Sequence, residues 1–110
     1  VFENSSHSRC FMYIGDAINI FLLSIKNTFK NQIVNIANPT EEIKISHLVK
    51  QIQKILKKNK KIEFRNVENM SILRRKPSIK KLKVLIGRTI KFTSLKKGLN
   101  IVHKYYENKN

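Results

Sequence analysis

The chain has 110 residues, with 23 lysines and arginines against 7 aspartates and glutamates, so its formal net charge at pH 7 is +16. This length allows one small domain, and a hydrophobic content of 41% is enough to form a core, which excludes a plainly disordered or collagen-like chain. The single cysteine, Cys10, excludes an intrachain disulfide and a cysteine-based zinc cluster, and we therefore expect a cytoplasmic protein. Every apolar run is shorter than the roughly 18 residues that span a bilayer, so we expect no membrane segment.

The first half of the chain predicts two strand–helix pairs. Residues 10–14 have the pattern of a short strand, and Asp16 is the expected N-cap of a helix over residues 17–26. That helix is apolar on nearly every side, so we expect it to be buried. Residues 32–37 are apolar on both faces, which is typical of an interior strand in a parallel sheet. An amphipathic helix is expected over residues 45–58.

The second half of the chain predicts one strand and two helices. Residues 62–67 alternate between apolar and polar side chains, as in a half-exposed strand. Ser78 is the expected N-cap of a short helix that Gly87 ends, and Ser94 is the expected N-cap of the last helix. The inward face of the short helix is expected to consist of Ile79, Leu82, Leu85 and Ile86. That of the last helix is expected to consist of Leu95, Leu99, Val102 and Tyr106.

The order of these elements predicts an α/β fold that does not close on itself. An interior strand of a parallel sheet needs a neighbour on each side and a helix layer on each face. The other two predicted strands are short and cannot supply all of these partners. We therefore expect a further part of the protein to precede residue 1.

Few residues have the spacing of a catalytic or metal site. Tyr105-x-x-x-Lys109 has the spacing of a dehydrogenase acid–base pair, but it lies at the chain end with no glycine-rich phosphate loop upstream, so we interpret it as coincidence. The three histidines share no ligand-like spacing with carboxylates, and we expect them on the surface. We assign no catalytic residue and no metal ligand to the chain.

The five arginines stand out in a chain whose usual cation is lysine. The bias toward lysine, isoleucine and asparagine runs along the whole chain, and we attribute it to an AT-rich genome rather than to nucleic-acid binding. Arg9 precedes an aromatic strand, and Arg74 and Arg75 precede a helix. Two guanidinium groups that converge on a diphosphate make charge-assisted, bidentate hydrogen bonds that lysine cannot match. The alternative is a set of solvated surface charges.

Four segments of the chain carry motifs of a known family. Residues 8–17, Ser-Arg-Cys-Phe-Met-Tyr-Ile-Gly-Asp-Ala, are similar to a Thr-Arg-Ser-Phe-x-Tyr-Val-x-Asp-Leu motif, and residues 34–42 are similar to Tyr/Val-Asn-Ile-Gly-Asn-Pro-x-Glu. Residues 74–83 resemble Arg-x-Pro-Asp-Ile-x-Lys-Ala-Lys, and residues 95–99 resemble Leu-x-x-Gly-Leu. In this order the motifs resemble the extended short-chain dehydrogenases that act on nucleotide sugars, and most of all the UDP-glucuronate decarboxylase group of the NAD-dependent epimerase/dehydratase family.

The resemblance implies that residues 1–110 are the C-terminal, substrate-binding portion of a Rossmann-type enzyme, with a late sheet strand and a small, mostly helical domain. It implies that NAD is bound by an N-terminal portion outside this sequence, and that a UDP-sugar is decarboxylated, epimerised or dehydrated by a homodimer. Arg9 and Arg75 are implied to bind the diphosphate of the sugar nucleotide. The further substrate-binding candidates are Arg74, His7 and Ser8.

The sequence also departs from the family pattern, and two alternatives stay open. Lys44 stands where a serine or threonine often caps a helix, and Ser78 replaces the usual aspartate. One alternative is a basic module that binds nucleic-acid phosphates through Lys54, Lys57, Lys58, Lys60 and Lys61. The other is a piece that folds poorly and has no activity of its own.

Overall fold

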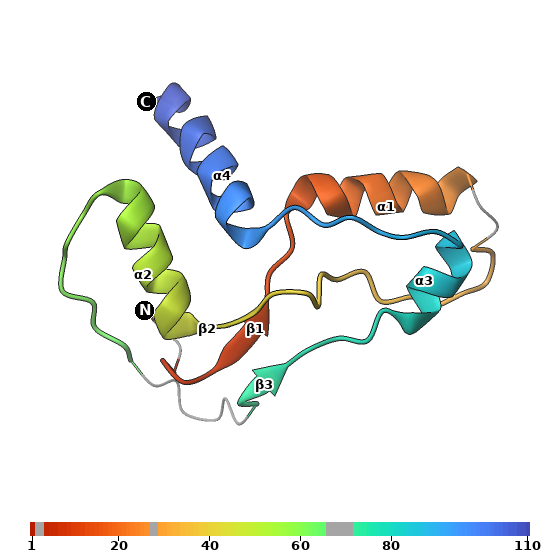
Figure 1. The fold of residues 1–110 in the computed structure, drawn as a ribbon, viewed down its shortest axis with the longest axis horizontal. Helices are drawn as coiled ribbons and strands as arrows, with labels where there is room; N and C mark the ends of the chain where they lie inside the picture. The colour runs from red at the N-terminus through yellow and green to blue at the C-terminus, as the bar shows by residue number, and fades with distance from the viewer. Residues whose placement is uncertain (2–3, 27–28, 66–71) are drawn as a thin grey trace.

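The computed structural model describes residues 1, 4–26, 29–65 and 72–110. These residues form a mixed α/β fold with four helices and three short strands (Figure 1). In chain order the elements are β1 (Ser8–Cys10), α1 (Ile14–Lys26), β2 (Glu42–Lys44), α2 (Ile45–Leu56), β3 (Arg74–Arg75), α3 (Lys80–Ile86) and α4 (Leu95–Lys109).

The strands form one small mixed sheet in the order β2-β1-β3. β1 runs antiparallel to β2, with Arg9 opposite Ile43, and parallel to β3, with Arg9 opposite Arg75. The backbone amide of Ser8 also donates a hydrogen bond to the carbonyl of Leu73 at 3.0 Å. The sheet thus brings together three segments that are far apart in the sequence.

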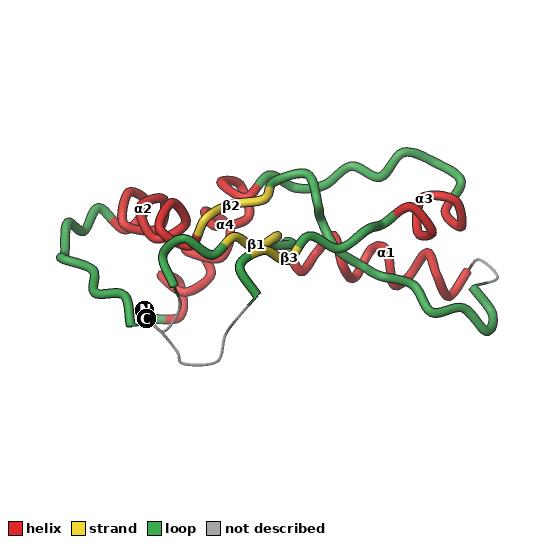
Figure 2. The backbone as a smooth tube through the Cα atoms, turned by 90° about the horizontal axis from the view of Figure 1, so that it is seen from below, coloured by secondary structure: helices red, strands yellow, loops and turns green. Residues whose placement is uncertain are grey.

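The molecule is flat and elongated. Its principal extents are 49 × 38 × 21 Å, and its radius of gyration is 16.5 Å, whereas a compact domain of this length has a radius of gyration of about 13 Å. Figure 2 shows the sheet, α2 and α4 toward one end and α1 and α3 toward the other. A chain of this shape leaves much of its apolar surface uncovered.

The buried core is small and joins α1 to the start of α3. Ile20, Ile79 and Leu82 are 3%, 4% and 0% exposed. Burial of Ile79 and Leu82 confirms part of the inward face predicted for the short helix. Partly buried apolar side chains surround these three residues: Met12, Phe29, Val34, Ala37, Ile86, Ile90 and Phe92.

Two of the predicted helix ends are confirmed. The Ser94 side chain caps α4 by accepting a hydrogen bond from the amide of Lys97 at 3.3 Å. Gly87 ends α3 with a φ of 68°, a left-handed conformation that costs a glycine little, and its amide donates to the carbonyl of Lys83 at 3.0 Å. Local sequence is enough to predict such ends because the cap contacts only the adjoining turn.

Three other helix ends differ from expectation or lack a side-chain cap. α1 begins at Ile14, so Asp16 lies in its first turn and not at its N-cap. The N-cap of α3 is Ile79, and the Ser78 hydroxyl lies one residue earlier, 3.5 Å from the amide of Lys80. Lys44 is the N-cap of α2 and makes no side-chain cap hydrogen bond, as expected from the departure at this position.

The strand predictions are mostly wrong. The first strand covers Ser8–Cys10 instead of 10–14, and residues 32–37 and 62–65 are not strands; residues 66–67 lie outside the described part of the chain. Ile33 is 91% exposed. A strand exists only where a neighbour accepts and donates its backbone hydrogen bonds, and residues 32–37 have no such neighbour among the described residues.

Two helices are more exposed than predicted. α1 is buried at Ile20, but its other face is at least half exposed at Ile14, Ile18, Phe21, Leu22 and Ile25. Val102 and Tyr106 of α4 are 42% and 61% exposed, because the C-terminal half of α4 extends away from the rest of the molecule (Figure 1). Within the described ranges, no helix combines the length and apolar character needed to cross a membrane.

Candidate functional site

The sheet register places Arg9 and Arg75 on the same face. They are partners in the parallel pairing of β1 and β3, and paired residues of parallel strands point to the same side because side chains alternate along each strand. Arg9 is half-buried and Arg75 is exposed. The register thus places these two distant residues side by side, and their binding of a diphosphate stays a prediction.

The opposite face of the sheet carries a hydrogen-bonded cluster around Glu42. The Ser8 hydroxyl donates to Oε1 of Glu42 at 2.6 Å. Arg74 donates from Nε to Oε1 at 2.5 Å and from Nη2 to Oε2 at 2.7 Å, which is a bidentate pair. Glu42 thus connects β2 to both other strands.

The pKa values of Glu42 and of the neighbouring Cys10 depart from their ordinary values. The hydrogen bonds donated by Arg74 and then by Ser8 lower the pKa of Glu42 from 4.5 to about 2, so the carboxylate is ionised at neutral pH. Burial raises the pKa of the Cys10 thiol, and the charge of Glu42 raises it further. The Cys10 thiol is therefore protonated at neutral pH and is a poor nucleophile.

The two arginines of the candidate site differ in their local contacts. Nη1 of Arg9 donates to the carbonyl of Ser8 at 2.8 Å and approaches that of Leu73 at 3.5 Å, which holds the guanidinium beside the β1–β3 junction. Arg75 makes no side-chain hydrogen bond or ion pair to another described residue. Its guanidinium is thus available to an anionic ligand.

The three remaining candidates have structural contacts. Arg74 and Ser8 both bond Glu42 on the face opposite Arg9 and Arg75. His7 is 6% exposed, so the expectation of a surface position is wrong for this histidine. A direct role of these residues in substrate binding stays a prediction.

The Tyr105 and Lys109 spacing has a structural explanation. Lys109 Nζ lies 4.7 Å from the ring centroid of Tyr105, one turn earlier on α4, in a cation–π contact at the exposed helix end. Among the described residues, no group of three or more histidine, cysteine or acidic side chains could hold a metal ion.

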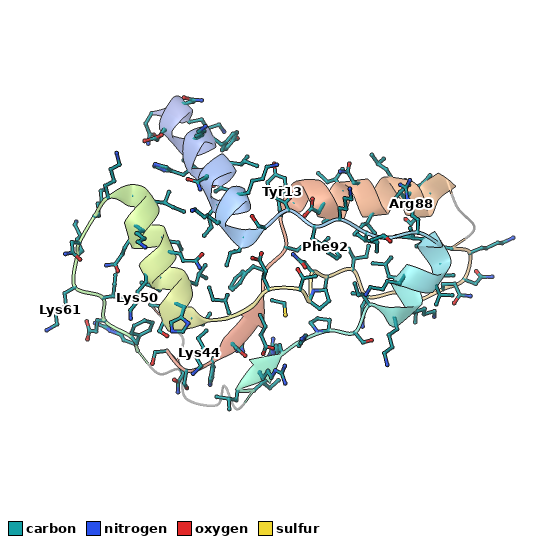
Figure 3. All side chains as sticks on the ribbon, in the orientation of Figure 1. Tyr13, Lys44, Lys50, Lys61, Arg88 and Phe92 are labelled. Carbon is teal, nitrogen blue, oxygen red and sulfur yellow. The ribbon has the colours of Figure 1, made fainter. Side chains whose placement is uncertain are left out.

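An apolar cavity lies between α2, α4 and the start of α1. The cavity has a volume of about 410 Å³. One of its lining residues, Tyr13, is labelled in Figure 3 near the junction of α1 and α4. Its lining has no charged side chain, so it does not suit a diphosphate. The lining residues are Phe11, Met12, Tyr13, Ile14, Leu48, Ile52, Thr93, Ser94, Leu95, Gly98, Leu99 and Val102.

Sequence reasoning missed Glu42 and Thr93. Asp16 accepts hydrogen bonds from the amide of Thr93 at 2.7 Å and from its hydroxyl at 2.9 Å. Both contacts join positions more than 30 residues apart. The one available signal was the scarcity of acids in this chain, which makes each carboxylate a candidate partner for many donors.

Comparison with known proteins identifies relatives of the chain. No family model matches it. It is 31% identical over 106 residues to UDP-glucuronic acid decarboxylase 1 of Danio rerio, covering 96% of this chain and 25% of that protein. It is 29% identical over 110 residues to an uncharacterized protein of Methanocaldococcus jannaschii, covering 99% of this chain and 33% of that protein.

Solved structures show the same fold. UDP-glucose 4-epimerase of Thermotoga maritima, solved with UDP-glucose, matches 99% of this chain and 34% of its own, with a TM-score of 0.84 and 20% identity. UDP-glucuronic acid 4-epimerase of Bacillus cereus, a Y149F mutant solved with UDP-4-deoxy-4-fluoro-glucuronic acid and NAD, matches 100% of this chain and 35% of its own, again with a TM-score of 0.84 and 20% identity.

The small mixed sheet and four helices match the C-terminal part of Rossmann-type extended short-chain dehydrogenases. The chain is thus similar in sequence to UDP-glucuronic acid decarboxylases and shares its fold with part of the solved nucleotide-sugar epimerases. It spans about a quarter to a third of the length of the curated relatives that it matches.

Proposed function

We propose that this chain binds the diphosphate of a UDP-sugar through Arg9 and Arg75, as the substrate-binding portion of an NAD-dependent sugar-nucleotide decarboxylase, epimerase or dehydratase. The observation that carries the proposal is the parallel register of β1 and β3, which puts the two arginines side by side on one sheet face. Relatives named as a UDP-glucuronic acid decarboxylase and as epimerases complexed with UDP-sugars support the substrate class. The comparisons do not favour the nucleic-acid alternative.

The charges of the sheet suit a diphosphate. Glu42 pairs with Arg74 on one face, whereas the other face carries Arg9 and Arg75. A guanidinium presents a rigid fork of N–H donors that matches phosphate oxygens, and two adjacent forks match two linked phosphates. Because Nη1 of Arg9 is held by the strand backbone, its guanidinium loses less conformational freedom when a ligand binds.

The residues of this chain do not fit NAD. A dinucleotide site of the Rossmann type needs a closely spaced run of glycines at a helix N-terminus, and the three glycines here are Gly15, Gly87 and Gly98. We therefore assign NAD to another part of the protein and no step of hydride transfer to this chain. The role proposed here is to bind and orient the sugar nucleotide.

Two surfaces of this chain support contact with a larger α/β part. Five apolar side chains on one face of α1 are at least half exposed, and Ile33 is 91% exposed in a segment without strand partners. Contiguous apolar surface of this kind marks an interface. We propose that the NAD-binding part covers α1 and pairs with residues 32–37.

Arginine substitutions test the diphosphate site. Arg9→Ala and Arg75→Ala should each weaken UDP binding to the protein by about 1.5 to 3 kcal/mol, since each removes charge-assisted hydrogen bonds to phosphate. Isothermal titration calorimetry with UDP and with UDP-glucuronic acid measures the effect. Unchanged affinity in both variants would show that the site is elsewhere.

The matched control is Arg88→Ala, which removes the same charge from an exposed loop. Figure 3 shows Arg88 at α1, toward the opposite end of the molecule from Lys44 of β2. This variant should bind UDP nearly as tightly as the wild type. Uridine, which has no phosphate, should bind all three variants and the wild type alike.

A further inference from the structure

Glu42 accepts hydrogen bonds from both of the other strands in its sheet. From β2 its carboxylate accepts from Ser8 of β1 at 2.6 Å and from Arg74 of β3 at 2.5 and 2.7 Å. The Glu42 side chain is 19% exposed, whereas that of Arg74 is 62% exposed. One carboxylate thus fixes how three strands lie against each other.

The contact to Arg74 matters because β3 is very short. It consists of Arg74 and Arg75, two neighbours with identical side chains that point to opposite faces. A slip of one residue in the pairing of β3 with β1 would turn Arg75 to the Glu42 face and Arg74 to the Arg9 face. Two ladder residues specify a register weakly, and a bidentate ion pair adds a specific constraint.

We infer that Glu42 is a positioning residue for the diphosphate site: by holding Ser8 and Arg74 on one sheet face, it directs Arg75 to the other face beside Arg9. This inference rests on the proposed function of Arg9 and Arg75. Glu42 itself does not contact the ligand, since it lies on the opposite face of the sheet. It also neutralises the charge of Arg74 on its own face of the sheet.

The sign of the expected effect distinguishes positioning from simple electrostatics. Removing a carboxylate makes the protein more positive, and long-range electrostatics alone would then tighten the binding of an anion. Loss of the correct position of Arg75 would instead weaken the binding of the anion. Glu42→Ala should therefore weaken UDP binding by about five- to tenfold, the equivalent of a lost hydrogen-bonded constraint, while the affinity for uridine stays within about twofold.

Two further variants complete the comparison. Glu42→Gln keeps a carbonyl acceptor for Ser8 or Arg74 and should bind UDP with an affinity between those of the wild type and Glu42→Ala. Glu63→Ala removes the same charge from an exposed side chain that lies 3.9 Å from Arg65, and it should bind UDP at least as tightly as the wild type. If Glu42→Ala fails to fold by circular dichroism, Glu42→Gln carries the same test against Glu63→Ala.

The outcomes separate this inference from the proposed function. If Arg9→Ala and Arg75→Ala weaken UDP binding but the Glu42 variants bind UDP as tightly as Glu63→Ala does, the positioning role is wrong and the site stands. If neither arginine variant changes UDP affinity, the proposed function fails and the inference fails with it. An equal loss of uridine and UDP affinity in the Glu42 variants would indicate a general structural role and overturn positioning.

Discussion

Individual acidic side chains hold this strongly basic chain together. The chain has 7 acids against 23 basic residues, and three of the acids connect segments that are distant in sequence. Asp16 accepts from Thr93, Glu41 accepts from the amide of Leu95 at the start of α4, and Glu42 accepts from Ser8 and Arg74. Each carboxylate accepts hydrogen bonds from a distant segment of the chain. Hydrogen bonds to a charged group stabilise a fold more than those between neutral groups.

Glu42 should make stability depend on pH in the acidic range. Its pKa is lowered from 4.5 to about 2 in the folded chain, so between these values the unfolded chain binds more protons than the folded one. Its contribution to stability is complete above pH 4.5 and is lost as the pH falls toward 2. Urea unfolding at several pH values should show a steeper acid-side decrease for the wild type than for Glu42→Gln. Identical slopes would contradict this assignment.

At the scale of elements, α3 shows how a seven-residue helix is held. Such a helix is too short to be stable by itself in water. It is held by Gly87 at its C-terminal end and by the burial of Leu82, which is fully enclosed, while Val84 on the other side is 79% exposed. Packing on one face therefore supplies most of its stability.

Substitutions on the two faces of α3 should differ sharply. Leu82→Ala should lower the free energy of unfolding by about 2 to 5 kcal/mol, because it removes a buried side chain and leaves a cavity. Val84→Ala is the matched control on the same helix and should change stability by about 0.5 kcal/mol or less. Chemical denaturation followed by circular dichroism measures both. Similar losses in the two variants would mean that α3 packs differently.

At the scale of the whole molecule, the described residues leave much apolar surface exposed to solvent. The thickness of 21 Å leaves room for little core, and α1 is apolar on two faces, of which one is covered. Only Ile20 of this helix is among the buried hydrophobic residues, while Ile18 and Phe21 are 50% and 57% exposed. Such surface favours association.

Polar substitution of the exposed face should raise solubility without loss of stability. Ile18→Gln and Phe21→Gln together should reduce concentration-dependent association of the 110-residue chain, measured by sedimentation velocity, and change the free energy of unfolding by about 1 kcal/mol or less. Ile20→Gln is the contrasting variant and should destabilise strongly, because it buries an amide in an apolar core. Association that persists in the double variant would point to another surface.

Sequence by itself determined the local features of this protein. The amphipathic α2, the Ser94 cap and the Gly87 helix end depend on residues three or four positions apart, and so they were predicted correctly. The choice of Arg9 and Arg75 as candidates also came from sequence, because arginine is chemically distinct in a chain rich in lysine and because the motifs resemble a known family.

The tertiary structure decided what depends on distant partners. Residues 32–37 have the composition of a strand but none of its hydrogen bonds, and Arg74–Arg75 form a strand that no local pattern predicted. Which of these two arginines faces Arg9 depends on a register between segments more than 60 residues apart. Backbone pairing and the Glu42 contacts fix that register, and neither leaves a periodic signal in the sequence, because each joins side chains or peptide groups that come together only in the folded chain.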